Sequence, residues 1–359
     1  MTNVTDLFMQ IVQIDSVSGE EKDMSNHLVD FFTQVCECKP VKDTYNNVFI
    51  QSNGEGEPLL LCAHMDTVEP GRGIVPILKD GTITSSGDTI LAADNKAAIA
   101  AIMSAVQYMH QHPEQSWRPL DILFTTWEED SCRGVIGFDR SKIRANIGYI
   151  FDGTGEIGDI ISASPCYGIF TVLIRGRSAH TENAHEAVPA LPTLMEIIHK
   201  IEELKSEKVL INIGEIRGGT AKNTIIGKFK IMGEIRSMYS DLFEQTLQKM
   251  RGILSKKYDC QLEWEVVQEN SGYIFSDTEI EPIKKVLEKL LNRKVSIHQS
   301  FGVSDANVLN QDPQKLKVFN LGDGSREVHT TRESTTVENL ETMKDLILKL
   351  AKNQEENNV

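Results

Sequence analysis

Runs of apolar residues that end abruptly in polar residues recur along this chain. The first run covers residues 59–63 and ends in His64-Met65-Asp66. Two later runs end in the same way, followed by Trp127-Glu128-Glu129-Asp130 and by Asp152-Gly153. A short apolar run predicts a buried strand of an α/β sheet, with the polar side chains at its carboxyl end. Because open α/β sheets bind ligands beyond the carboxyl ends of their strands, this pattern predicts a functional site at that edge of the sheet.

Helical spacing of apolar residues marks segments between these strands. Residues 3–35 predict two helices, and Ser18 followed by Glu21 is a capping-box pattern at the start of the second helix. Another helix is expected to begin at or just after Asp94, because apolar residues recur at helical spacing beyond it. Aspartate is also a preferred helix N-cap, so a plain capping role remains open for Asp94. Further helices are predicted near residues 281–291 and 337–352.

The segment from residue 164 to residue 271 has a different pattern. Its strands alternate apolar and polar positions, which is typical of half-buried antiparallel strands. Two helices covering one face of a four-stranded antiparallel sheet would form a self-contained α+β module. We therefore expect an α/β domain made of residues 1–163 and 272–359, with an α+β domain of residues 164–271 inserted into it.

Composition and charge exclude several classes of protein. The net charge of −15 over 359 residues would repel a phosphate backbone, so we expect no nucleic-acid partner. Neither a transmembrane run nor a signal-peptide pattern is found, which predicts a cytoplasmic protein without a membrane partner. The six cysteines are scattered and do not have the spacing of a zinc finger or a disulfide framework.

The polar residues at the predicted strand ends and loops include possible metal ligands. They are His64, Asp94, Glu128, Glu129, Asp152 and His329. Imidazole and carboxylate groups suit zinc, and in a two-ion site with ions roughly 3.5–4 Å apart one carboxylate would bridge them. Such a site polarises a carbonyl and supplies hydroxide at neutral pH, and one glutamate can act as its base. The alternative for residues 128–130 is a solvated acidic loop.

Taken together and in order, these motifs resemble those of a known family. The motifs are His64-Met65-Asp66-Thr67-Val68, Ala93-Asp94-Asn95-Lys96, Thr126-Trp127-Glu128-Glu129, Phe151-Asp152-Gly153, Gly218-Gly219-Thr220-Ala221-Lys222-Asn223 and the late His329. The chain is similar to the di-zinc exopeptidases that include peptidase T, aminoacylase and the glutamate carboxypeptidases, and most similar to the peptidase T branch. This resemblance covers nearly the whole chain. It implies a mixed-sheet catalytic domain with an inserted lid and dimerisation domain.

The resemblance also implies a role for each site residue. His64 and Asp152 would bind one zinc, Glu129 and His329 would bind the other, and Asp94 would bridge the two. Glu128 would be the general base, and Asp66 would orient His64. Contacts with the substrate are implied for His180, Asn223, Arg236, Ser304 and Asp305. The residues themselves leave alternatives open: His180 can be an exposed loop histidine, and Arg236 can lie on a solvated strand face.

By resemblance, we expect a cytoplasmic metallo-aminopeptidase that acts on short peptides, tripeptides in particular, through a metal-bound hydroxide. It would use two Zn²⁺ ions per chain, although Mn or Co could occupy the same ligands. The inserted domain would form a homodimer. A deacylase of N-acyl amino acids would need the same metal site, so that alternative remains open. A non-catalytic peptide-binding homologue is the third hypothesis, and its signature would be a missing ligand or base.

Overall fold

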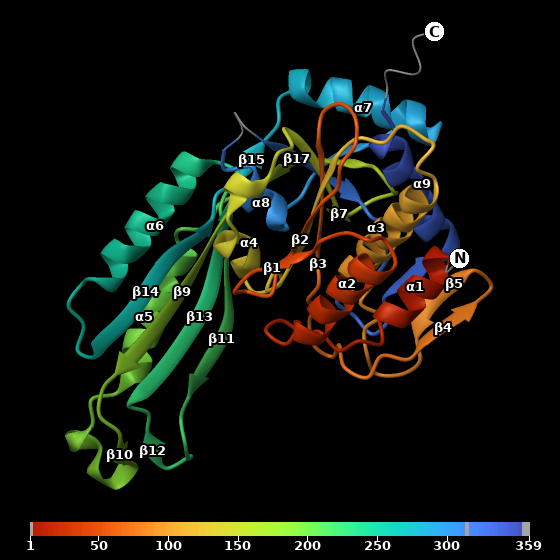
Figure 1. Cartoon of the computed structure of the whole chain (residues 1–359). Helices are drawn as coiled ribbons and strands as arrows, with labels where there is room; N and C mark the ends of the chain where they lie inside the picture. The colour runs from red at the N-terminus through yellow and green to blue at the C-terminus, as the bar shows by residue number, and fades with distance from the viewer. Residues whose placement is uncertain (1–2, 313–315, 354–359) are drawn as a thin grey trace. The chain divides into compact units, whose positions relative to one another are not determined.

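The computed structural model describes residues 3–312 and 316–353 (Figure 1). The chain divides into two compact units. The first consists of Met1–Ser162, Phe275–Ser300 and Ser304–Val359, and the second of Ala163–Ile274 with Phe301–Val303. The roles that we expect for the two parts, catalysis and lid or dimerisation, stay predictions.

The described residues form a nine-stranded mixed sheet whose strands, except β15 and the last two residues of β8, belong to the first unit. The strands run in the order β1-β2-β6-β3-β7-β17-β8-β15, with β16 beside β8. Their bounds are β1 (Val41–Lys42), β2 (Val48–Gln51), β3 (Leu59–His64), β6 (Leu120–Thr125), β7 (Ile147–Gly153), β8 (Ile160–Ser164), β15 (Tyr273–Ile274), β16 (Ile297–Gln299) and β17 (Lys317–Gly322). The central strands β6, β3, β7 and β17 are parallel, and the pairs β1-β2, β2-β6, β17-β8 and β8-β15 are antiparallel. The predicted α/β class with a mixed sheet is confirmed.

Strand β3 is buried along its whole length because it lies at the centre of the sheet. All six of its residues are buried. Helix α3 (Ala93–Gln111) packs on β3 and β7, and helices α1 (Val4–Ile11) and α9 (Val337–Ala351) pack on α3. The α3 sequence is rich in buried alanines, whose small side chains let neighbouring elements approach closely. This packing explains the continuous apolar run in the sequence of β3.

The loop before helix α2 (Lys22–Gln34) differs from the capping box that the sequence indicated. No side chain caps this helix. The Ser18 hydroxyl donates instead to Asp66 Oδ2 at 2.7 Å. The Glu21 carboxylate accepts from the backbone N–H groups of Gly19 and Trp127, both at 2.9 Å. The capping prediction is therefore wrong, because tertiary contacts with the ends of β3 and β6 use both side chains.

Smaller elements complete the first unit. They are α4 (Arg133–Gly137), η1 (Arg140–Lys142), α7 (Asp277–Leu291), α8 (Asp305–Leu309), and a small sheet of β18 (Ser334–Thr336), β5 (Thr82–Ser85) and β4 (Pro76–Lys79). Strands β4 and β5 pair antiparallel and form a hairpin. Its two turn residues, Asp80 and Gly81, have φ angles of 50° and 79°, as a tight two-residue hairpin requires.

The second unit forms the α+β module that its alternating pattern predicts. In the described residues its main sheet has four antiparallel strands in the order β11 (Leu210–Gly218), β13 (Lys228–Ser237), β9 (Cys166–Arg175) and β14 (Gln261–Asn270). Helices α5 (Ala190–Glu202) and α6 (Ser240–Leu254) pack on these strands and on each other. Shorter elements are β10 (Ala179–His180), η2 (Thr181–Glu186) and β12 (Thr224–Ile225). The inward side chains of the sheet and both helices share one apolar core.

None of the helices within residues 3–312 and 316–353 has the length and apolar character needed to cross a bilayer.

A buried carboxylate in β6 contributes to the stability of the fold. Asp121 is fully buried, and its carboxylate accepts from the backbone N–H groups of Arg144 and Ala145 and from the Arg144 guanidinium. We expect Asp121→Ala to lower the free energy of unfolding by about 3–5 kcal/mol, because it leaves these donors unpaired. Urea denaturation measures this change. The matched control Asp345→Ala removes an exposed carboxylate and should change stability by about 0.5 kcal/mol or less; equal effects would contradict the prediction.

Candidate metal centre

The carboxyl ends of the parallel strands bring together most of the predicted ligands. His64 is the last residue of β3, Glu128 and Glu129 follow β6, and Asp152 lies near the end of β7. Asp94 lies in the first turn of α3, where its φ and ψ angles of −81° and 107° are not helical. The loop between β17 and β18 supplies His329. All of these residues belong to the first unit.

The carboxylate of Asp94 lies between two imidazoles. Its Oδ1 is 3.0 Å from Nε2 of His64, and its Oδ2 is 3.3 Å from Nε2 of His329. Glu129 Oε1 lies 2.7 Å from the same nitrogen of His329. Two groups of potential ligands therefore share Asp94: His64 with Asp94 and Asp152, and Asp94 with Glu129 and His329, with the ligand atoms of each group within 4.8 Å of one another. One oxygen directed to each group is the arrangement that a bridging carboxylate needs.

Asp66 supports this edge of the sheet in two ways. The main-chain oxygen of Asp66 lies 2.9 Å from Nδ1 of His64, and its carboxylate Oδ1 lies 3.6 Å from the same nitrogen. These contacts hold the ring so that Nε2 faces Asp94. The carboxylate of Asp66 also accepts from the backbone N–H groups of Glu128 and Glu129, at 2.9 and 3.1 Å. The His-x-Asp spacing indicated the first contact, but nothing in the sequence indicated the second.

Crowding of buried acids shifts the protonation of this site. Burial raises the pKa of Glu128 well above its usual range, and the nearby Asp152 carboxylate raises it further. Burial and the nearby Asp94 carboxylate also raise the pKa of Asp152 well above its usual range. Hydrogen bonds with Asp94 and Glu129 raise the pKa of His329 to about 10. A divalent cation would neutralise this excess of negative charge, and the imidazole and carboxylate donors fit zinc or a similar ion.

Behind Glu128 lies a second buried group that the sequence did not indicate. Glu128, Cys132 and Asp305 place ligand atoms within 4.8 Å of one another, and Cys132 Sγ lies 3.8 Å from Glu128 Oε1. Burial raises the pKa of the Cys132 thiol well above its usual value, which keeps it protonated. Cys132 lies four residues after Glu128, and that spacing alone was too common to single it out.

The predicted substrate residues Ser304 and Asp305 are both buried, with exposed fractions of 5% and 2%. Ser304 caps α8, and its hydroxyl accepts from the backbone N–H of Ala306. Asp305 Oδ2 accepts from the Thr125 hydroxyl at 2.5 Å. Asp305 is therefore hydrogen-bonded to the end of β6, and Ser304 is hydrogen-bonded within the first turn of α8. Their contact with a substrate stays a prediction.

The other predicted substrate residues lie in the second unit. His180 and Asn223 are exposed, and Nε2 of His180 lies 3.1 Å from Nδ2 of Asn223. Arg236 lies on β13, where its guanidinium donates to the carbonyl of Phe301 and pairs with Glu234. The structure thus brings His180 and Asn223 together and gives Arg236 separate partners. Their roles stay predictions.

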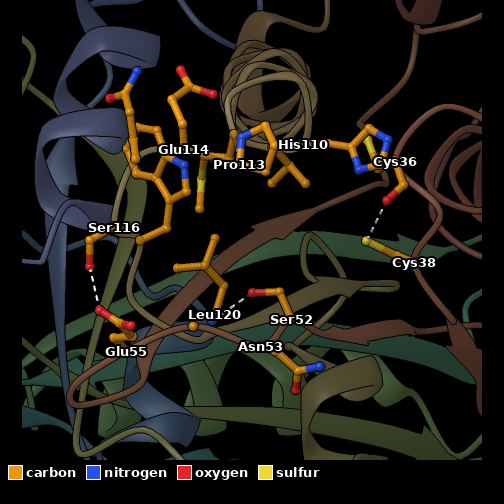
Figure 2. A pocket seen from close by; sticks show the side chains of 15 residues that line it. Cys36, Cys38, Ser52, Asn53, Glu55, His110, Pro113, Glu114, Ser116 and Leu120 are labelled. Carbon is orange, nitrogen blue, oxygen red and sulfur yellow. Dashed lines mark hydrogen bonds between the residues drawn. The ribbon is translucent and has the colours of Figure 1, made fainter.

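A cavity of about 640 Å³ lies at the opposite end of the central sheet (Figure 2). Its lining includes Ser52, just after β2, and Leu120, the first residue of β6. Two of its polar side chains are paired, because the Ser116 hydroxyl donates to Glu55 at 2.8 Å. None of the described residues that line this cavity is a predicted site residue. It is therefore separate from the candidate metal centre.

Known peptidases match both the sequence and the fold of this chain. The structure of aminopeptidase PepT from Bacillus cereus is 30% identical, covers 97% of both chains and has a TM-score of 0.81. A tripeptidase structure from Staphylococcus aureus is 25% identical, covers 97% of both chains and has a TM-score of 0.86. A dinuclear metal-binding peptidase of family M20 from Bacillus subtilis shares the fold, with 15% identity, a TM-score of 0.67, and coverage of 97% of this chain and 96% of that one.

The family model agrees with these structures. Residues 60–353 match the model of peptidase family M20/M25/M40. This matched range includes every predicted metal ligand. The resemblance to the exopeptidase family is confirmed, and the chain belongs to peptidase family M20/M25/M40.

Proposed function

We propose that this chain is a metal-dependent exopeptidase that removes the N-terminal residue from short peptides, tripeptides in particular. Membership of the family supports a hydrolase of peptides, and the similarity to an aminopeptidase and a tripeptidase supports the finer specificity. One observation carries the proposal: the two oxygens of Asp94 face His64 and His329 separately, as a bridge between two ions requires.

Five residues would hold two divalent ions. His64 and Asp152 would bind one ion, Glu129 and His329 the other, and Asp94 both. When bound, the ions would polarise the scissile carbonyl and lower the pKa of water. Zinc suits this mixture of imidazole and carboxylate donors, and Mn or Co could replace it.

Glu128 is the general base of this proposal. Glu128 is 7% exposed, and its carboxylate lies in one group of possible ligands with His64 and Glu129, next to the proposed ions. A carboxylate whose pKa is raised by burial can accept the proton of the attacking water and pass it to the leaving amine. Asp66 fixes the backbone of Glu128 and the ring of His64, so base and ligand keep their places.

Several finer features belong to the same proposal. His180, Asn223 and Arg236 would contact the substrate or its developing oxyanion, and Ser304 with Asp305 would lie near the substrate carboxylate. The second unit would form a homodimer and act as a lid. We propose a cytoplasmic location, and the six free cysteines are consistent with a reducing compartment.

Metal analysis and a matched substrate panel test this function. We expect two divalent ions per purified chain and release of the N-terminal residue from a tripeptide. N-acetylation of the same tripeptide should abolish its hydrolysis, because an aminopeptidase recognises the free amine. Turnover of N-acetyl amino acids alone would replace the proposal with the deacylase reading. Full metal loading without turnover of any substrate would favour the non-catalytic homologue.

A further inference from the structure

Glu333 is a buried carboxylate that accepts three backbone hydrogen bonds from the Asp94 loop. Its exposed fraction is 1%. Oε2 accepts from the N–H groups of Leu91 and Ala92, both at 2.9 Å, and Oε1 accepts from the N–H of Asp94 at 3.1 Å. Hydrogen bonds to an ionised acceptor are stronger than neutral ones, and three of them on one side chain fix its position and that of the loop.

The loop that Glu333 holds has a conformation that needs support. Ala92 has a φ angle of 60°, in the left-handed region that non-glycine residues rarely adopt. Asp94 follows with extended rather than helical angles. Successive N–H groups that converge in this way form a concave site for an anion. The Glu333 carboxylate occupies that site and compensates the cost of the backbone conformation.

Glu333 and His329 belong to the same short loop. Reciprocal backbone hydrogen bonds between Arg326 and Ser334, at 2.9 and 3.0 Å, close this loop. Its C-terminal end continues into β18, which pairs with β5. A single closed loop therefore presents the His329 imidazole to Asp94 Oδ2 and, through Glu333, holds the backbone of Asp94 itself.

We propose that Glu333 is a positioning residue that fixes the Asp94 loop to the His329 loop, so that the bridging carboxylate is in place before any metal binds. This inference rests on the proposed function, because it assigns Asp94 as the bridge. Glu333 touches neither substrate nor ion in this proposal and acts only through Asp94. Positions 94 and 333 are 239 residues apart, so the side chain couples two distant parts of the sequence.

Hydrogen exchange of the metal-free protein tests directly whether Glu333 fixes the Asp94 loop. Glu333→Gln keeps the size of the side chain but replaces one of its two acceptor oxygens with an NH₂ group. Because NH₂ cannot accept a hydrogen bond, at least one of the three backbone N–H groups loses its partner. We expect the amides of Leu91, Ala92 and Asp94 to exchange at least about tenfold faster than in the wild type, because their charged acceptor is lost. The control Glu327→Gln makes the same charge change in the same loop at an exposed site and should leave these amides unchanged. Equal exchange in the two variants would overturn the proposal.

Zinc titration separates positioning from simple charge. We expect Glu333→Gln to bind Zn²⁺ roughly 10–100-fold more weakly than the wild type, as is typical when a residue that supports a ligand is lost. Glu333→Asp keeps the negative charge but is one methylene shorter. Positioning predicts a loss close to that of Glu333→Gln, whereas affinity near the wild-type value for Glu333→Asp would show a purely electrostatic effect and overturn the proposal.

The same titration distinguishes this inference from the proposed function. A wild-type protein that binds no divalent ion contradicts the proposed function itself. A wild-type protein that binds two ions, with unchanged affinity in Glu333→Gln, contradicts only the positioning role. If Glu333→Gln does not fold, exchange and titration of the Glu333→Asp variant decide the question in the same way.

Discussion

Replacing Glu128 with glutamine should slow peptide turnover by orders of magnitude and leave the metal content of the protein near its wild-type value. Glutamine has nearly the same shape but cannot accept the proton of the attacking water. Loss of a general base costs about 10²–10⁴-fold in kcat. The surrounding backbone should not move, because Asp66 holds the N–H of residue 128 and not its side chain. Steady-state kinetics on a tripeptide and metal analysis of the same sample measure both quantities.

A neighbouring carboxylate provides the control for this variant. Asp130 is two residues further along, and its side chain is 43% exposed and pairs with Arg133. Asp130→Asn makes the same chemical change and should keep both turnover and metal. Loss of an ion from Glu128→Gln would identify Glu128 as a ligand and contradict its assignment as the base.

Asp94→Ala should remove both ions and with them all measurable turnover. The Asp94 carboxylate belongs to both groups of potential ligands, so its loss would leave each group with two protein donors. We expect the metal content to fall from two ions to less than one per chain at micromolar free zinc. Because metal ions contribute several kcal/mol of transition-state stabilisation, kcat/KM should fall by about 10³-fold or more.

The control for this variant is Asp88→Ala, which removes an exposed carboxylate six residues earlier. It should retain two ions and wild-type kinetics. His64→Ala should lose fewer ions than Asp94→Ala, since His64 belongs to only one of the two groups that share Asp94. Loss of a single ion from Asp94→Ala, with the other bound normally, would contradict a bridging position.

The sequence was informative where local pattern and global fold agree. The apolar run of β3 ends at His64 because a central parallel strand is buried on both faces, and its end is the place where solvent and ligands reach the sheet. The same reasoning applies to Asp152 at the end of β7. The alternating pattern of the second unit likewise indicated an antiparallel sheet with two covering helices, as found.

Contacts between distant residues could not be predicted from the sequence. Ser18 and Glu21 have the spacing of a helix cap, but tertiary partners use both side chains. Glu333 is one of many glutamates, and only the folded loop reveals its three donors. His180, Asn223 and Arg236 were indicated by resemblance alone, and their chemical roles depend on a bound substrate.

The separation of two proposed ligands along the chain has a consequence for biosynthesis. His64 and His329 lie 265 residues apart along the chain (329 − 64), with the entire second unit translated between them. At about 5–20 residues per second, a ribosome needs roughly 13–53 s to make the intervening stretch. For most of translation a nascent polypeptide therefore lacks one of the five proposed ligands, His329. Premature termination before codon 329 would yield a product that lacks the second imidazole.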